Sequence, residues 1–370
     1  MFFFYVTLAY TIPNIYVFFR INHLFIGKGY KLWYTLIYIL LAAIYPLSRY
    51  LPDNEMSLAM QILDTVSGYL LPFYLYLFLS VFVYDLFLLL NFLFKWVSVK
   101  TRKSFRYRFS TLSVLIFLAV VVVVGGVINL NNTQVSHYKI TVPRKSSNLD
   151  KLRVAFVADF HIHSGLPVSF VEKYVEKVNN LNPDLMFYGG DIVDDRKVHP
   201  ELERITGLFR TIKSRFGVFG VLGNHEFYRG HADGAFFKQA GIVLLNDSLA
   251  TIGQSFIVAG RFDEHFRNRK SVEEILGNNL PQLPVLMMDH RPTSFDEVIQ
   301  FSVDAHFSGH THNGQLFPIN FIIKNMYELA WGYMKKKDTH FFVTSGLRLW
   351  GPPVKTAGKS EIMVVDFTFE

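Results

Sequence analysis

The chain has 370 residues, is 51% hydrophobic and 16% aromatic, and carries a formal net charge of +7. Its mean hydropathy of +0.24 is too high for an ordinary soluble protein, and its length allows two or three domains. It contains no cysteine, which excludes disulfides, zinc–cysteine sites and thiol nucleophiles. The positive charge is conspicuous between Lys95 and Arg108, beside apolar stretches, and therefore indicates membrane topology rather than nucleic-acid binding.

Residues 1–130 are predicted to form an all-α transmembrane domain of about four helices. Apolar stretches that approach or reach the length of a bilayer span lie at 2–19, 32–47, 69–94 and 112–128. The first stretch is the weakest candidate, because Pro13 is expected to break or kink the helix. The third carries Asp85, which either has a function inside the membrane or reaches water near a helix end. Residues 131–150 are expected to form a polar linker with one edge strand at 137–142.

The distribution of basic residues predicts the orientation of the chain. The loop over 95–108 has six basic residues and no acidic one, whereas the loop before the third stretch sets Arg49 against acidic residues. By the positive-inside rule the 95–108 loop is cytoplasmic, so the last stretch carries the chain outward. We therefore expect an integral, multi-pass membrane protein whose residues 151–370 lie outside the cytoplasm.

From residue 151 onward, strands alternate with helices, which is typical of an α/β domain. Apolar runs predict strands at 153–158, 185–188, 218–222, 257–259, 285–288, 305–307, 341–344 and 362–367. Helical spacing of apolar residues predicts helices over 167–180 and 200–213. In sheets of this kind, the ligand site lies beyond the carboxyl ends of the strands.

Residues of metal-ligand type follow five of these strands. The clusters read A-D-F-H, G-G-D-I-V-D, G-N-H-E, M-M-D-H-R-P and G-H-T-H, and they supply Asp159, His161, Asp191, Asn224, His225, Glu226, His290, His310 and His312. Carboxylate and imidazole ligands suit Mn, Fe or Zn better than Mg or Ca alone. Without His225 and Glu226, seven candidate ligands remain, which are too many for one ion but fit two ions that share a carboxylate. Two such ions, about 3.5–4 Å apart, can clamp a phosphoryl group and ionise a bridging water as the nucleophile.

These five clusters, in this order, resemble the calcineurin-like metallophosphoesterases over roughly 152–366. The resemblance implies a sandwich of two mixed β-sheets flanked by helices, an α/β (α+β) fold, and a centre of two divalent metal ions. It implies that the first ion is held by Asp159, His161 and His312, and the second by Asn224, His290 and His310. Asp191 would bridge the two ions.

The resemblance also implies a catalytic role for His225, with Asp191 and Asn224 beside it. His225 would protonate the leaving oxygen or stabilise the transition state. One departure is visible, because Asn313 stands where many members of the family have the first glycine of G-H-T-H-G-G-Q. Asparagine tolerates a positive φ better than most residues, so we expect the turn to survive.

Several other residues are expected to have plainer roles. Asp194 and Asp195 are predicted to lie in a solvated loop, from which either could orient a ligand. Arg261, Asp263 and Arg348 could contact the substrate, but they are expected to be solvated, as lone charges on loops usually are. The apolar stretch 317–334 is expected to pack in the core, and its alternative is a rim that faces the bilayer or an acyl chain.

The sequence thus predicts a membrane-anchored phosphoesterase that hydrolyses a phosphate ester or pyrophosphate, for which a lipid-linked compound is a candidate, and that binds no nucleic acid. One alternative turns the same domain to the cytoplasm, where it would resemble the UDP-diacylglucosamine pyrophosphohydrolases of lipid A synthesis. Another is a membrane receptor or scaffold that binds metal or ligand without turnover. The receptor is disfavoured because no ligand of the five clusters is missing.

Overall fold

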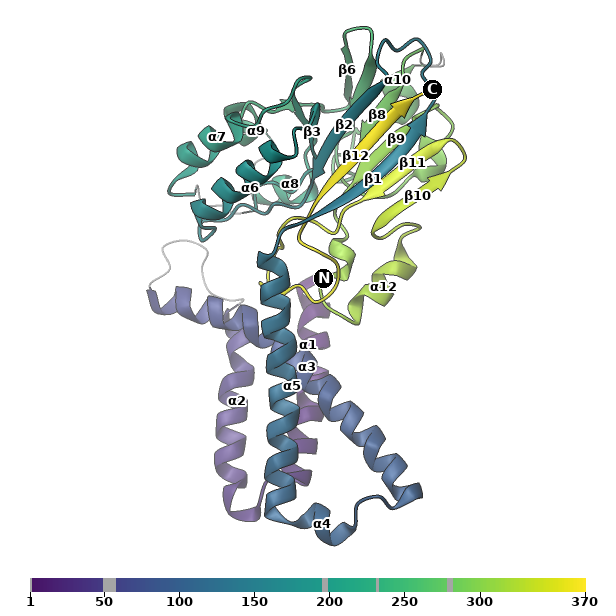
Figure 1. The fold of residues 1–370 in the computed structure, drawn as a ribbon. Coiled ribbons are helices and arrows are strands. Elements are labelled where there is room, and N and C mark those ends of the chain that lie inside the picture. Colours follow the sequence, from purple (N-terminus) through teal and green to yellow (C-terminus); the bar gives the residue numbers. More distant parts are fainter. Residues whose placement is uncertain (1, 49–57, 195–198, 231–232, 278–281) are drawn as a thin grey trace. The chain divides into compact units, whose positions relative to one another are not determined.

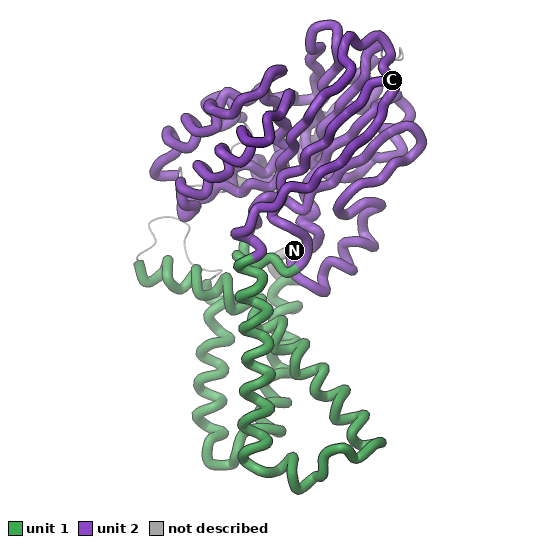
Figure 2. The backbone as a smooth tube through the Cα atoms, in the orientation of Figure 1, with its two compact units in different colours: residues 1–128, 351–356 green, residues 129–350, 357–370 purple. Residues whose placement is uncertain are grey.

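The computed structural model describes residues 2–48, 58–194, 199–230, 233–277 and 282–370. The chain divides into two compact units, of which one comprises Met1–Ile128 with Gly351–Thr356 and the other Asn129–Trp350 with Ala357–Glu370 (Figure 2). The short segment Gly351–Thr356 belongs to the first unit although it lies late in the sequence. Within it, the Lys355 N–H donates to the Gly126 carbonyl at 3.1 Å. A side chain at Gly126 would lie 2.6 Å from Val354 Cγ1, so this close approach requires glycine.

The first unit is helical in its described residues (Figure 1). Its elements are α1 (Phe2–Leu24), η1 (Lys28–Tyr30), α2 (Lys31–Ser48), α3 (Leu58–Phe94), α4 (Val99–Lys103) and α5 (Phe105–Asn131). Three helical segments in the described part of the chain are long and apolar enough to cross a membrane, namely Lys28–Ser48, Leu58–Phe94 and Phe105–Asn131. Helix α1 is not among these three.

Helix α1 is continuous through Pro13, so the break expected there does not occur. Polar side chains contact the backbone beside this proline. Asn14 Nδ2 donates to the Tyr10 carbonyl at 2.9 Å, and the Tyr38 hydroxyl of α2 donates to the Asn14 carbonyl at 3.0 Å. The second of these bonds also joins α1 to α2.

Asp85 of α3 is paired inside the helical unit. Arg20 of α1 donates through Nε to Asp85 Oδ2 at 2.7 Å, and the Tyr16 hydroxyl donates to the same oxygen. Only 18% of the Asp85 side chain is exposed. The acid therefore joins α1 to α3 through its contacts with Arg20 and Tyr16.

The second unit contains two six-stranded sheets (Figure 1). In the first, the order is β1 (Gln134–Val142), β12 (Glu361–Phe369), β2 (Lys151–Val157), β3 (Leu185–Tyr188), β4 (Val218–Gly220) and β5 (Val243–Leu244). In the second, the order is β10 (Gly332–Lys336), β11 (Thr339–Val343), β9 (Ala305–Ser308), β8 (Val285–Met288), β7 (Phe256–Gly260) and β6 (Ser248–Ile252). Both sheets are mixed, as predicted. The first is parallel except between β12 and β2, and the second is antiparallel only at its two edges.

The main core lies between the two sheets because strand residues alternate between faces. Val154 and Phe156 of β2 pack inward against Phe307 of β9, and all three are fully buried. The intervening Ala155 and Val157 face the opposite way. The helices of this unit are α6 (Val168–Asn180), α7 (Leu202–Arg210), α8 (Asn224–Arg229), α9 (Ala235–Gln239), α10 (Val272–Leu276), α11 (Phe295–Val298), η2 (His312–Gly314) and α12 (Ile319–Met326).

Helices cover the outer faces of both sheets. Val171 and Val175 of α6 belong to the cluster on the first sheet, and Phe295 and Val298 of α11 belong to the cluster on the second. Helix α12 is different, because it has no buried side chain among its described residues. The prediction that residues 317–334 pack in the core is therefore wrong for this helix. It holds for Ala330, which is buried.

Candidate metal centre

The candidate ligands follow the carboxyl ends of strands in both sheets. Asp159 and His161 follow β2, Asp191 follows β3, and Asn224 begins α8 just after β4. From the second sheet, His290 follows β8, and the pair His310 and His312 follows β9. Strands β2, β3 and β4 are parallel neighbours, as are β8 and β9, so each sheet presents its ligands at one edge.

The backbone of these loops is unusual at the candidate ligands. Five of them have a positive φ, between 48° and 71°, which non-glycine residues seldom adopt: Asp159, His161, Asp191, His310 and His312. Such conformations persist where the surrounding structure enforces them, and they cluster at functional sites. Asn313 also has a φ of 48°, so the turn survives there as expected.

Two glycines let these loops approach the acidic ligands. A Cβ atom at Gly223 would lie 2.2 Å from Asp191 Oδ1, and one at Gly309 would lie 2.5 Å from Asp159 Oδ2. Neither separation is possible for a side chain, because real Cβ atoms do not come this close to other heavy atoms. The glycines of G-N-H-E and G-H-T-H are thus required by the packing around the candidate site.

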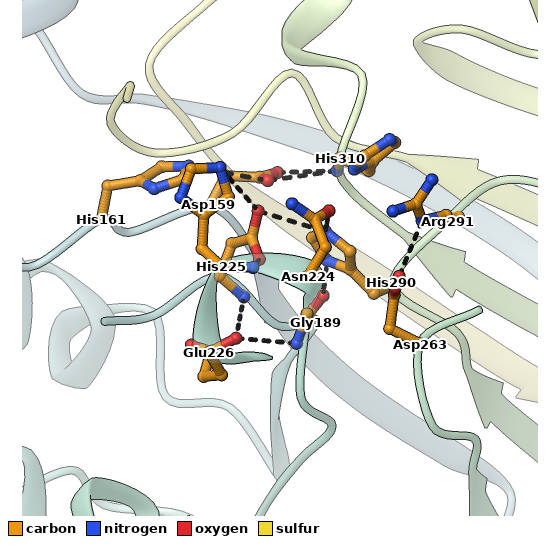
Figure 3. A network of polar contacts seen from close by, with 12 residues as sticks. Asp159, His161, Gly189, Asn224, His225, Glu226, Asp263, His290, Arg291 and His310 are labelled. Carbon is orange, nitrogen blue, oxygen red and sulfur yellow. Dashed lines mark hydrogen bonds and ion pairs between the residues drawn. The ribbon is translucent and has the colours of Figure 1, made fainter. Parts of the chain in front are cut away.

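The first group of converging atoms comprises Asp159, His161 and His312. The Nε2 atoms of the two histidines lie 3.2 Å apart, and His312 Nε2 lies 3.5 Å from Asp159 Oδ1. All three side chains are buried. The Asp159 carboxylate is also fixed by the backbone N–H of His310, which donates to its Oδ2 at 3.0 Å (Figure 3).

The second group comprises Asp191, His290 and His310, whose candidate ligand atoms lie within 4.8 Å of one another. His290 Nε2 is 3.2 Å from Asp191 Oδ2 and 3.2 Å from Asn224 Oδ1, so the amide oxygen joins this group (Figure 3). Asp191 also forms a group with His161 and His225 within the same limit. Its carboxylate is therefore adjacent to ligands of both groups.

The electrostatics of the centre favour bound cations. Burial acts to lower the pKa of His290, but the Asp191 and Asp159 carboxylates outweigh it and raise that pKa to about 10. A pKa raised this far means that the buried carboxylates stabilise a positive charge beside them, and a bound cation can supply that charge. Burial lowers the pKa of His310 to about 3, so this imidazole is neutral, as a metal ligand must be. The donor set of imidazole, carboxylate and amide groups thus fits divalent transition metals.

His225 is oriented by Asp194, which the sequence prediction had assigned to a solvated loop. Asp194 Oδ1 is hydrogen-bonded to His225 Nδ1, while Asp194 Oδ2 lies 3.6 Å from His161 Nδ1. Only 12% of the Asp194 side chain is exposed. Burial acts to raise the pKa of Asp194, but the two histidines outweigh it and hold that pKa well below its usual range. Asp195 lies outside the described residues.

The bond from Asp194 leaves His225 Nε2 directed toward the candidate centre, 4.0 Å from Asp191 Oδ2. The backbone N–H of His225 donates to Asp191 Oδ1 at 2.8 Å, so the two residues are also held together through the main chain. The side chain of His225 is 13% exposed, and it therefore combines a fixed position with access from outside.

Glu226, the last residue of G-N-H-E, serves the backbone rather than the candidate centre. Its fully buried carboxylate accepts the N–H groups of Asp191, Ile192, Val193 and Gly223 at 2.6–3.0 Å. It thereby ties the loop after β3 to the loop after β4. Four backbone donors on one carboxylate explain why an acidic residue stands at this position.

Arg261 and Asp263 are buried, so the expectation that they are solvated is wrong. Arg261 Nη1 donates to Glu297 at 3.1 Å. Asp263 accepts from Arg291 Nε at 2.8 Å and is hydrogen-bonded to His265 Nδ1 at 2.7 Å (Figure 3). These ion pairs brace the loop that carries His290, and they bring the Arg291 guanidinium close enough to His310 to help lower its pKa.

Comparison with known proteins finds metallophosphoesterases. The sequence profile of the calcineurin-like phosphoesterases matches residues 152–314. The chain is 30% identical over 225 residues to an uncharacterized metallophosphoesterase of Helicobacter pylori, covering 58% of this chain and 59% of that protein. It is 29% identical over 276 residues to the transmembrane protein with metallophosphoesterase domain of Danio rerio, covering 70% and 62%. The chain thus spans about three fifths of the length of these relatives.

Among solved structures, TT1561 of Thermus thermophilus is similar over 53% of this chain and 89% of its own, with a TM-score of 0.32 and 8% identity. The two-sheet arrangement is the fold that the sequence predicts. Residues 152–314 match the profile of the calcineurin-like phosphoesterases, a family whose members are phosphoric ester hydrolases.

Proposed function

We propose that this chain is a membrane-anchored phosphoesterase that works with two divalent cations. Asp159, His161 and His312 would hold one, and Asn224, His290 and His310 the other. The observation that carries the proposal is the position of Asp191, whose carboxylate is adjacent to ligands of both groups. A shared carboxylate is what a pair of cations about 3.5–4 Å apart requires. The donor types favour Mn, Fe or Zn.

The cations, when bound, would polarise a phosphoryl group and supply an ionised water as nucleophile. The remaining steps belong to side chains of this chain. His225, held at Nδ1 by Asp194, would give a proton from Nε2 to the leaving oxygen. Asn224 would hold a phosphoryl oxygen through its amide in addition to binding a cation. Arg291 brings positive charge to the same region, which suits an anionic substrate.

We further propose that residues 1–130 anchor the enzyme in a membrane, that 131–150 link the two parts, and that the catalytic domain at 151–370 is extracytoplasmic. Three apolar helices support the anchoring. The basic loop over 95–108, which includes α4, supports the orientation because basic loops stay in the cytoplasm. The substrate would be a phosphate ester or pyrophosphate, with a lipid-linked compound as the candidate that the anchoring favours.

Hydrolysis by the full-length protein in detergent tests this function. The substrates are a bis-aryl phosphodiester, an aryl monophosphate and a lipid pyrophosphate, each assayed with Mn²⁺ and with chelator. We expect Mn²⁺-dependent turnover of at least one of them, which His225→Ala lowers by about 10²–10⁴-fold, the usual contribution of a positioned acid. Bound metal without turnover of any of the three would instead favour a binding protein.

A further inference from the structure

Helix α12 (Ile319–Met326) exposes an apolar surface that nothing in the described domain covers. Phe321, Ile322 and Met326 are 57%, 61% and 67% exposed, and Ile319 is 36% exposed. We call Ile319, Phe321, Ile322 and Met326 the α12 patch. Single exposed apolar residues are ordinary on a protein surface, but four on one short helix mark an interaction site.

The helix has one side toward the domain and one side away from it. Asn320 faces the domain, and its Oδ1 is buried there. A Cβ atom on Gly314 would lie 2.8 Å from the backbone nitrogen of Asn320, so the two backbone segments are in close contact. Ile319, Ile322 and Met326 are spaced i, i+3 and i+7, so they share another side of the helix. These three side chains therefore form one apolar side of α12, and the exposed Phe321 lies beside it on the same helix.

The patch lies at the end of the domain where the chain arrives from the membrane helices. Trp331, five residues beyond Met326, donates through Nε1 to Glu361 at 2.6 Å. Glu361 is the register partner of Gln134, the first residue of β1. Only two residues separate Gln134 from Asn131, the last residue of α5, a distance of at most about 11 Å along an extended chain.

The charges around the patch also suit a lipid surface. Lys324 of α12 is exposed, as are Lys335 and Lys337 farther along the chain. Tyr333, 40% exposed, adds an amphipathic ring of the type enriched at membrane interfaces. An apolar helix face flanked by lysines is the pattern of helices that lie in the headgroup region of a bilayer.

We propose that α12 lies in the surface of the bilayer in which the protein is anchored, with the α12 patch among the lipid headgroups and upper acyl chains. The helix directly adjoins the candidate metal centre. It follows η2, which contains His312, and Tyr327 at its end packs with its ring 6.3 Å from that of His310. Docking of α12 would hold the centre at headgroup level, where the phosphate of a membrane lipid is found.

From this placement we infer that the substrate is a phosphoester or pyrophosphate carried on a membrane lipid. This inference about the substrate rests on the proposed phosphoesterase function. The docking itself does not depend on that function and is measured separately. Because the chain has no cysteine, one introduced cysteine can carry a label in the full-length protein. Met326→Cys places it in the patch, and Val243→Cys is the matched control. Val243 is 51% exposed and lies on β5, at the opposite edge of the first sheet from β1.

Each variant is labelled with an environment-sensitive fluorophore and reconstituted in vesicles of phosphatidylcholine with a minority of phosphatidylglycerol. Aqueous iodide and a lipid with a nitroxide on its acyl chain serve as quenchers. At Met326→Cys we expect a blue-shifted emission, weak quenching by iodide and strong quenching by the nitroxide. At Val243→Cys we expect the reverse.

Equal iodide quenching at the two positions would overturn the proposal, because α12 would then face water. A label at position 326 that is shielded from both quenchers would also overturn it, since protein would then cover the patch. That result would indicate a second copy of the chain or another part of this one.

The substrate class is tested with the double variant Phe321→Ser, Ile322→Ser beside Val243→Ser. Turnover of a phosphoester lipid in the vesicles is divided by turnover of the soluble bis-aryl phosphodiester. We expect this ratio to fall severalfold in the double variant only, and an unchanged ratio would contradict the lipid substrate. If the wild-type protein hydrolyses neither compound, the phosphoesterase function fails, while the quenching result still decides the docking.

Discussion

At the scale of single residues, Asp194 and His225 form a pair in which the carboxylate fixes one imidazole nitrogen and leaves the other for the substrate. In Asp194→Asn a neutral amide that can also donate replaces the carboxylate, so His225 loses its fixed orientation and its charged partner, and we expect turnover to fall by up to roughly 10²–10⁴-fold. The metal content should stay unchanged, because Asp194 belongs to none of the candidate ligand groups.

Steady-state kinetics and elemental analysis of the purified variant check this prediction. Asp150→Asn is the control, because the Asp150 side chain is 80% exposed and lies away from the centre. Parallel loss of metal and turnover in Asp194→Asn would mean that the residue acts by supporting His161, whose Nδ1 lies 3.6 Å from it.

The sequence predicts the candidate ligands better than it predicts the residues that support them. Asp159, Asp191 and His290 could be found because each follows a recognisable strand. Asp194 could not, because its position depends on a bridge between Ile162 and Val193 that joins two loops from separate strands. The only local signal for this role is that Asp194 lies close to Asp191 in the sequence. Outside a helix or strand, such spacing does not predict where a side chain points. The roles of the ligands themselves stay a prediction.

At the scale of elements, the pairing of α1 with α3 depends on Asp85 and Arg20. In Asp85→Asn the arginine keeps its charge in an apolar environment without a counter-ion, at a cost of about 3 kcal/mol. We expect a lower midpoint of thermal unfolding for the full-length protein in detergent. Asp338→Asn, at an exposed position of the second unit, should leave the midpoint unchanged. Equal midpoints for the two variants would show that the pair contributes nothing to stability.

The elements best predicted from sequence are those with long, regular apolar patterns. The runs 185–188 and 285–288 coincide with β3 and β8, because buried central strands are uniformly apolar. Short edge strands such as β5, with two residues, give no such pattern. Helix α12 was misassigned for a different reason. An apolar run normally indicates core, but that inference weakens in a chain that has a membrane beside it.

At the scale of the whole molecule, the proposed topology places the basic loop over 95–108 in the cytoplasm and the C-terminus outside. A reporter enzyme that is active only outside the cytoplasm is fused in turn after Glu370 and within this loop. We expect activity from the C-terminal fusion alone, because the basic residues of the loop resist translocation. Activity from the loop fusion alone would mean that the catalytic domain lies in the cytoplasm.

The dinuclear centre is tested most directly by measuring metal content and hydrolysis together in wild-type and Asp191→Asn protein. Asp191 is the single carboxylate adjacent to both candidate groups among the described residues. For the wild type we predict two divalent ions per chain and hydrolysis that chelation abolishes. For Asp191→Asn we predict loss of bound metal and of metal-dependent hydrolysis. Full metal content with hydrolysis that still requires it would contradict the shared-carboxylate centre.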